Sequence, residues 1–149
     1  MIHYRNDVKG SGVDARALKA TMRKLLESLD EPDAAISLTL VGDAAIQKLN
    51  RLHRRQDKPT DVLSFPLDPG EIEGPERLLG DIVISVDTAR RQASDYDAPL
   101  QREIYRLAIH GLLHVLGHDH IETEERAVME AEERRLAAAI GMPWPYDEP

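Results

Sequence analysis

The chain has 149 residues, which is enough for one domain and short for two. Hydrophobic residues make up 42% of it and charged residues 31%, so the composition excludes an intrinsically disordered protein. The formal net charge of -8 argues against wholesale nucleic-acid binding, and the absence of cysteine excludes disulfide bonds, thiolate metal ligands and a cysteine nucleophile.

Apolar periodicity predicts a series of short elements in one domain that covers residues 1–149. In chain order we expect a strand at 2–6, a helix at 13–29, a strand at 35–41, a helix at 42–54, strands at 61–67 and 80–86, and helices at 86–96, 99–117 and 123–140. Asp43 and Thr123 are the expected N-caps of their helices, and Gly117 and Gly141 are expected to end the last two helices. The segment 68–76 is rich in Pro and Gly and is expected to be a loop.

Helices lie between most of the predicted strands, which favours an α/β or α+β fold around one small sheet. The second half of the helix at 99–117 is apolar almost all round, so we expect this helix to run through the interior. The β-branched run Ile82, Val83, Ile84 predicts a strand that is buried on both faces.

No apolar run approaches the roughly 18 residues that a membrane-spanning helix requires. The first ten residues, MIHYRNDVKG, contain no apolar segment typical of a secretory signal. We therefore expect a cytoplasmic protein that does not act at a membrane.

Charge is distributed unevenly along the chain. Segment 51–58, RLHRRQDK, carries four Arg or Lys residues and one Asp, whereas the acidic residues gather at 68–76 and 122–133. Such runs are usually solvated surface, but a basic segment on an acidic protein can also form a local site for phosphate groups.

The segment HGLLHVLGHDH, residues 110–120, holds four of the six histidines in the chain. His110 and His114 are four residues apart on the predicted interior helix, so their side chains project from one face and can reach a common ion. Gly117 lets the chain turn, and either His118 or His120 could then supply a third ligand. Neutral imidazoles suit Zn²⁺, and three protein ligands leave a fourth position open, as in catalytic zinc sites. The pattern predicts about one zinc ion per chain.

Gly111 stands where the zinc-protease pattern H-E-x-x-H has a glutamate. That glutamate takes a proton from water at the metal, and glycine cannot do so. The sequence therefore disfavours a protease of this type, although it does not exclude hydrolysis. Two roles are open for Gly111: it lets another element pack close to the helix, or it leaves room for a bulky substrate beside the metal.

The histidine segment resembles the signature of the YbeY endoribonucleases, the bacterial rRNA maturation factors, which reads H-G-x-x-H followed by G-[YH]-D-H. Residues 49–67, LNRLHRRQDKPTDVLSFPL, resemble the family's LN…R…DKPTDVLSFP block, and residues 78–85, LLGDIVIS, resemble its LGDI strand. The resemblance implies an α+β domain with a small mixed four-stranded sheet, about five or six flanking helices and the metal-site helix in the interior.

The resemblance also implies roles for individual residues. His110, His114 and His120 would bind zinc, and His118 would be a neighbour of the site. Asp119 is a candidate hydrogen-bond partner for an imidazole N–H. Arg54, with adjacent Arg55 as the alternative, falls at the family's functional arginine and would hold a phosphate group.

The implied activity is zinc-dependent cleavage of single-stranded RNA in the maturation of the 16S rRNA 3′ end and in ribosome quality control. The implied partners are ribosomal RNA and the small ribosomal subunit with its proteins, and not DNA. Two other functions are open on the sequence. One is a metal-stabilised ribosome-assembly factor that binds without cleaving, and the other is a metalloprotease whose base lies elsewhere in the chain.

Overall fold

A computed structural model of the chain describes residues 1–67, 77–118 and 122–144. The predicted loop at 68–76, Asp119 and His120 lie outside the described residues. The elements are β1 (Ile2–Asn6), α1 (Ala15–Ser28), β2 (Ala34–Val41), α2 (Asp43–Arg54), β3 (Val62–Pro66), β4 (Arg77–Ser85), α3 (Val86–Asp95), α4 (Leu100–Val115) and α5 (Thr123–Ala139). Every predicted strand and helix is present, with ends that differ by a few residues.

The strands form one sheet in the order β1-β2-β4-β3. β2 pairs with β1 and with β4 in parallel, whereas β3 pairs with β4 in the antiparallel direction and forms an edge. Along the register, Ile82 of β4 lies between Leu38 of β2 and Ser64 of β3. The predicted α+β fold with a mixed four-stranded sheet is therefore confirmed, with five helices among the described residues.

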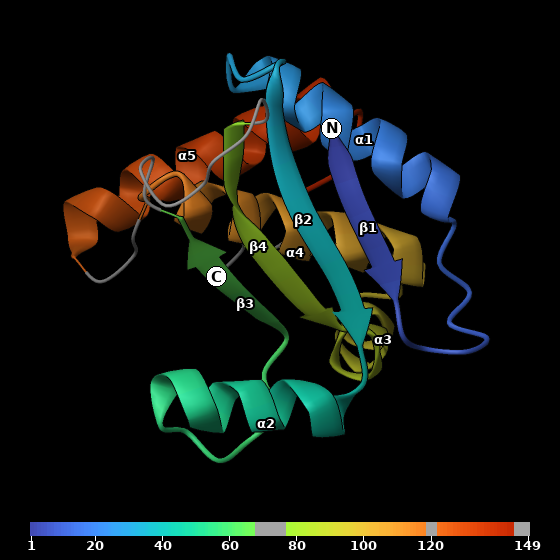
Figure 1. Ribbon diagram of the computed structural model, residues 1–149. Helices are drawn as coiled ribbons and strands as arrows, with labels where there is room; N and C mark the ends of the chain where they lie inside the picture. Colours follow the sequence, from blue (N-terminus) through green and yellow to red (C-terminus); the bar gives the residue numbers. More distant parts are fainter. Residues whose placement is uncertain (68–76, 119–121, 145–149) are drawn as a thin grey trace.

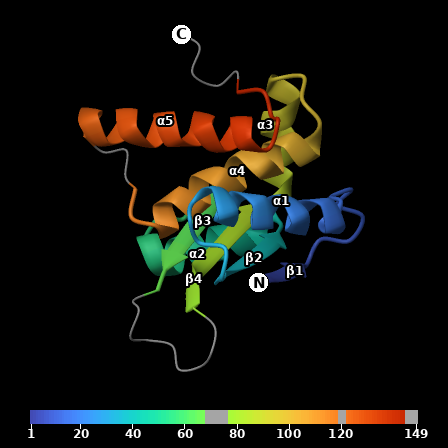
Figure 2. The same ribbon diagram turned by 90° about the horizontal axis from the view of Figure 1, so that it is seen from above.

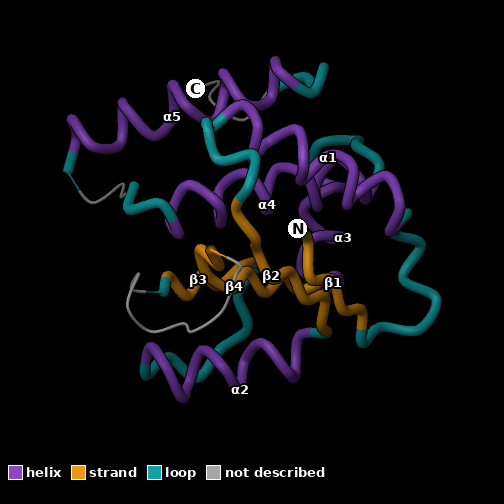
Figure 3. The backbone as a smooth tube through the Cα atoms, turned by 45° about the horizontal axis from the view of Figure 1, so that its top comes forward, coloured by secondary structure: helices purple, strands orange, loops and turns teal. Residues whose placement is uncertain are grey.

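The helices cover the two faces of the sheet unequally. α2 lies on one face, and α1, α3, α4 and α5 lie on the other (Figures 1 and 3). α4 contacts β3 and β4 as well as α1, α3 and α5, and it lies between the sheet and α5 (Figure 2). Most of its side chains from Ile104 to Val115 are buried, which confirms the interior position predicted from its apolar surface.

Side chains of β4 contribute to a separate core on each face of the sheet. Ile82 and Ile84 belong to the main core, which fills the space between the sheet and the helices of the α4 side. Val83 belongs to a smaller core under α2, where it packs with Ile46 and Leu63. The predicted burial of this strand on both faces is confirmed, because successive side chains of a strand point to opposite faces.

The start of α2 differs from the prediction. Its N-cap is Gly42, so Asp43 is the first helical residue and not the cap. The backbone N–H of Asp43 instead donates to the carboxylate of Asp87 on α3, at 2.9 Å. The Asp43 carboxylate accepts hydrogen bonds in return from Ser85, the N-cap of α3, and from Thr88 and Arg91 of α3. Burial alone would raise the pKa of Asp43, but these hydrogen bonds and the charge of Arg91 lower it below its usual value.

The prediction for α5 was also wrong by one residue, because the N-cap is Glu122 and Thr123 is the first helical residue. Glu122 makes no capping hydrogen bond with its side chain. Acidic residues in the first turn favour a helix start through the helix dipole, and Glu124 and Glu125 occupy that turn. Among the described helices, none is both long and apolar enough to cross a membrane.

Candidate metal centre

The predicted histidine helix ends in a tight turn directly after His114. Gly117 has a φ of 97°, which confirms its predicted role at the end of α4. The N–H of Gly117 donates to the carbonyl of His114, and the N–H of His118 donates to the carbonyl of Leu113, both at 3.0 Å. These two bonds form a Schellman motif, in which a glycine is favoured because it adopts the left-handed conformation without strain.

His110 and His114 form a pair, called the histidine pair below. Their Nε2 atoms lie 3.1 Å apart, their ring centroids lie 4.6 Å apart, and the ring planes meet at 74°. A tetrahedral zinc ion with Zn–N bonds of about 2.0–2.1 Å holds two ligand nitrogens about 3.3–3.4 Å apart. The two Nε2 atoms are therefore spaced almost as two nitrogen ligands of one zinc ion are, which makes the pair a suitable half of a zinc site.

The second nitrogen of His110 faces a carboxylate on another helix. Nδ1 of His110 lies 3.2 Å from Oε2 of Glu133 on α5. An ionised carboxylate can only accept a hydrogen bond, so this contact fits the His110 tautomer that carries its hydrogen on Nδ1. In a neutral imidazole the lone pair is then on Nε2, which is the nitrogen directed at His114.

Sequence analysis did not identify Glu133, because its partner lies 23 residues away on a different helix. One signal of it is present in the sequence. Glu133 falls on the buried stripe of α5 at helical spacing with apolar residues, namely Met129, Leu136 and Ala137. A charged residue in an apolar stripe requires a partner, and this one could have been marked for that reason.

The surroundings of Gly111 decide between its two open roles. A Cβ atom at this position would lie 2.9 Å from Cγ2 of Ile82 and 3.1 Å from Oγ of Ser64. The hydroxyl of Ser64 also donates to the carbonyl of Gly111 at 3.0 Å. Gly111 therefore lets β3 and β4 pack directly against α4. A glutamate here would point at the strands, so it could not act as the base of a zinc protease.

A chain of polar contacts holds α4 against α3 and the start of β3. Arg106, one turn before His110, forms an ion pair with the fully buried Glu103, with Nε 2.9 Å from Oε1. Arg106 also donates to Gln92 of α3 at 3.2 Å, and Gln92 donates to Asp61 at 3.3 Å. Asp61 ends the DKPTD block, so this chain connects that block to the histidine helix.

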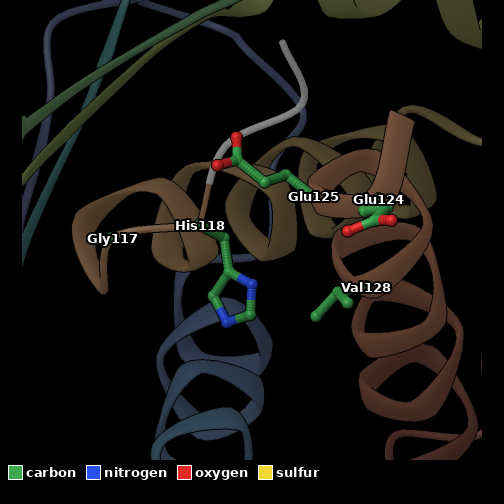
Figure 4. Close-up of a pocket in the computed structure, with 5 residues that line it drawn as sticks. All are labelled: Gly117, His118, Glu124, Glu125 and Val128. Atoms are coloured by element: carbon green, nitrogen blue, oxygen red, sulfur yellow. The ribbon is translucent and has the colours of Figure 1, made fainter. Parts of the chain in front are cut away.

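His118 and His110 lie in different hollows of the surface. His118 points into the space beside α5 and lines an open groove of about 440 Å³ together with Gly117, Glu124, Glu125 and Val128 (Figure 4). His110 lines a smaller hollow of about 150 Å³ together with Arg126, Met129, Glu130 and Glu133.

The described part of the predicted metal site is the histidine pair. No group of three His, Asp or Glu side chains that could hold a metal ion occurs within residues 1–67, 77–118 and 122–144. The predicted third ligand, His120, and the neighbouring Asp119 lie outside these ranges. The assignment of His120 therefore stays a prediction.

Arg54 lies on the other side of the sheet from the histidine pair. It is the last residue of α2, and its side chain is exposed. The ring of its neighbour His53 packs edge-on against Phe65 of β3, with ring centroids 5.1 Å apart. The adjacent β3 residue, Ser64, contacts α4 instead. The edge strand β3 lies between α2, which ends at Arg54, and α4, which carries the histidine pair (Figure 3).

Comparison with known proteins gives one consistent result. The family model described as "Endoribonuclease YbeY" matches residues 3–141. A protein named Endoribonuclease YbeY from Syntrophotalea carbinolica is 44% identical over 143 residues, which cover 94% of this chain and 95% of that protein. Another of the same name, from Moorella thermoacetica, is 50% identical over 117 residues, or 74% of this chain and 75% of that protein. The solution structure of TM1509 from Thermotoga maritima matches with a TM-score of 0.66 and 27% identity, over 94% of this chain and 89% of that one.

Proposed function

Because the chain belongs to the Endoribonuclease YbeY family, we propose that it is a zinc-dependent endoribonuclease that cleaves single-stranded RNA. The family name supports an RNA-cleaving hydrolase. The observation that carries the zinc dependence is the pair of Nε2 atoms that converge at 3.1 Å on the interior helix. The proposed substrate is precursor ribosomal RNA, in the maturation of the 16S rRNA 3′ end and in ribosome quality control. We further propose that the enzyme acts in the cytoplasm, with the small ribosomal subunit and its proteins as partners.

In this proposal His110, His114 and His120 hold the zinc ion. When bound, zinc supplies Lewis-acid chemistry, because it polarises a phosphoryl oxygen and makes a coordinated water more acidic. The protein supplies the geometry. α4 fixes the ligands His110 and His114 one turn apart, and the Schellman motif at Gly117 ends this helix directly after the second ligand. The buried ion pair of Glu103 and Arg106 anchors the same helix one turn earlier.

Arg54 has the role of holding a phosphate group of the RNA in this proposal. A guanidinium can hold a phosphate with two parallel hydrogen bonds, and Arg54 is exposed and able to do so. An RNA strand that contacts both Arg54 and the histidine pair would pass over the edge strand β3. A flexible single strand can follow such a path more easily than a stiff duplex, which supports the proposed preference for single-stranded RNA.

We expect metal analysis of the purified protein to find about one zinc per chain. His110→Ala, His114→Ala and His120→Ala should each lose most of the zinc, since each removes one of three ligands. His118→Ala is the matched control and should retain it, because His118 lines a different hollow from His110. Zinc retained in His120→Ala and lost in His118→Ala would transfer the third ligand position to His118.

The activity itself is tested with a precursor RNA that extends beyond the mature 16S 3′ end, supplied free and within small ribosomal subunits. The wild type should cleave it, and His114→Ala should bind it with equal affinity without cleaving it. If the zinc-loaded wild type binds the RNA as His114→Ala does and also fails to cleave it, the protein is a binding factor for ribosome assembly and the proposed activity is wrong.

Binding to single-stranded RNA should weaken as salt rises, because phosphate contacts release counterions. If the four basic residues of segment 51–58 each contact one phosphate, the slope of log K against log salt is about −2.8, or about 50-fold weaker binding between 50 and 200 mM salt. A fluorescence titration at several salt concentrations measures the slope. Tight binding to duplex DNA that does not depend on salt would contradict the proposal.

A further inference from the structure

Glu133 is a buried carboxylate for which helix packing gives no reason. Its side chain is only 10% exposed, and its neighbours on the buried stripe of α5 are apolar. Burying a carboxylate costs free energy unless a partner compensates it, and an apolar residue would suit this stripe better. The position of Glu133 therefore indicates a role in the contact that its carboxylate makes.

That contact is made with one particular nitrogen of a predicted metal ligand. Oε2 of Glu133 lies 3.2 Å from Nδ1 of His110, and the opposite ring nitrogen, Nε2, lies 3.1 Å from Nε2 of His114. The imidazole of His110 thus has the carboxylate on one side and the other histidine on the other side. Carboxylates placed in this way fix the tautomer and orientation of metal-binding histidines in other proteins.

We infer that Glu133 is a positioning residue for His110. Its carboxylate accepts the hydrogen bond from Nδ1–H, which keeps the ring in the tautomer whose lone pair is on Nε2 and holds that lone pair in the direction of His114. The inference rests on the zinc site proposed above, because orienting the lone pair has a purpose only if an ion binds there. It differs from a merely structural link between α4 and α5, which would not control the position of the ring hydrogen.

The first experiment examines the ring itself, in metal-free protein. Long-range ¹H–¹⁵N NMR spectra distinguish the two tautomers of a neutral imidazole, at a pH about two units above the unperturbed histidine pKa of about 6.5. We expect His110 to carry its hydrogen on Nδ1 in the wild type. Glu133→Gln should keep this tautomer, because the amide oxygen still accepts. Glu133→Met should give a mixture of both tautomers.

The second experiment measures zinc affinity by competition with a chelator. Loss of an outer partner of a metal ligand typically weakens binding by about 10–100-fold, and we expect this loss for Glu133→Met. Glu133→Gln should stay close to the wild type. The matched control is Glu130→Met, which removes a carboxylate of the same charge from the same hollow. The carboxylate of Glu130 is paired with Arg134 at 4.0 Å, whereas that of Glu133 contacts His110. This control should bind zinc as the wild type does.

Methionine suits the apolar stripe and leaves little cavity, so both Glu133 variants should fold, and thermal melting of the metal-free proteins checks this. Wild-type affinity and an unchanged tautomer in Glu133→Met would overturn the inference. Equal losses of affinity in Glu133→Gln and Glu133→Met would also overturn it, because the charge and not the hydrogen bond would then matter. Failure of the zinc site itself gives a different result: the wild type and His110→Ala would bind zinc equally poorly, whatever the tautomer.

Discussion

Gly111→Glu, which completes the H-E-x-x-H pattern, is expected to destabilise the protein severely and not to create a protease. The first side-chain carbon alone would lie 2.9 Å from Cγ2 of Ile82 and 3.3 Å from Cγ2 of Val62. Both methyl groups belong to β-branched side chains of the sheet, which have little freedom to move aside. The rest of the glutamate would have to separate α4 from β3 and β4.

The expected loss can be estimated from Gly111→Ala. Overpacking costs about 1–3 kcal/mol, and the better helix propensity of alanine returns about 1 kcal/mol, so Gly111→Ala should lose about 0–2 kcal/mol. Glutamate adds a carboxylate among apolar side chains, which costs several kcal/mol more. A total on the order of 5 kcal/mol is comparable with the whole free energy of unfolding of an ordinary domain, about 5–15 kcal/mol.

Urea denaturation followed by circular dichroism measures this series. Ala127→Glu is the control, because it introduces the same side chain at an exposed position of α5 and should change the free energy of unfolding by no more than about 0.5 kcal/mol. If Gly111→Glu proved as stable as Ala127→Glu, the close contact between α4 and the strands would be wrong, and the space at Gly111 would be available to a substrate.

Arg54→Glu is expected to abolish most RNA cleavage while the fold and the zinc content remain near those of the wild type. The side chain is exposed at the end of α2, so its loss should have little effect on folding. Removing one positioned electrostatic donor costs about 10²–10³-fold in other enzymes, and reversing the charge should cost more because it repels the phosphate. Single-turnover cleavage of a single-stranded RNA, beside metal analysis and a thermal melt, gives all three quantities.

Two further variants test the reason for this effect. Arg54→Lys should recover only part of the activity, because an ammonium group cannot make the two parallel hydrogen bonds of a guanidinium. Arg55→Glu makes the same charge change one residue later, where the backbone has a φ of 58° and ends the helix, and should be milder. Greater sensitivity at Arg55 would move the phosphate contact by one residue. Normal binding and cleavage in both reversals would exclude an arginine role for this segment.

The sequence by itself determined the elements of the fold and the pairing of two of the three histidines in the proposed metal site. Apolar periodicity placed each strand and helix, and the apolar surface of the helix at 99–117 predicted its interior position. The spacing of His110 and His114 predicted one shared face, and their Nε2 atoms do converge. The turn at Gly117 was also predictable. These features depend on residues within a few positions of one another, so local patterns are sufficient to predict them.

Only the tertiary structure decided the features that depend on contacts between elements. Asp87 on α3 satisfies the first N–H of α2, which is why a capping prediction based on nearby residues chose Asp43 wrongly. Gly111 had two possible roles until the strands were placed against it. Glu133 reaches His110 across 23 residues because α5 packs along α4. In each case the deciding partner lies on an element whose position follows from packing of the whole core, and a local sequence pattern does not contain that information.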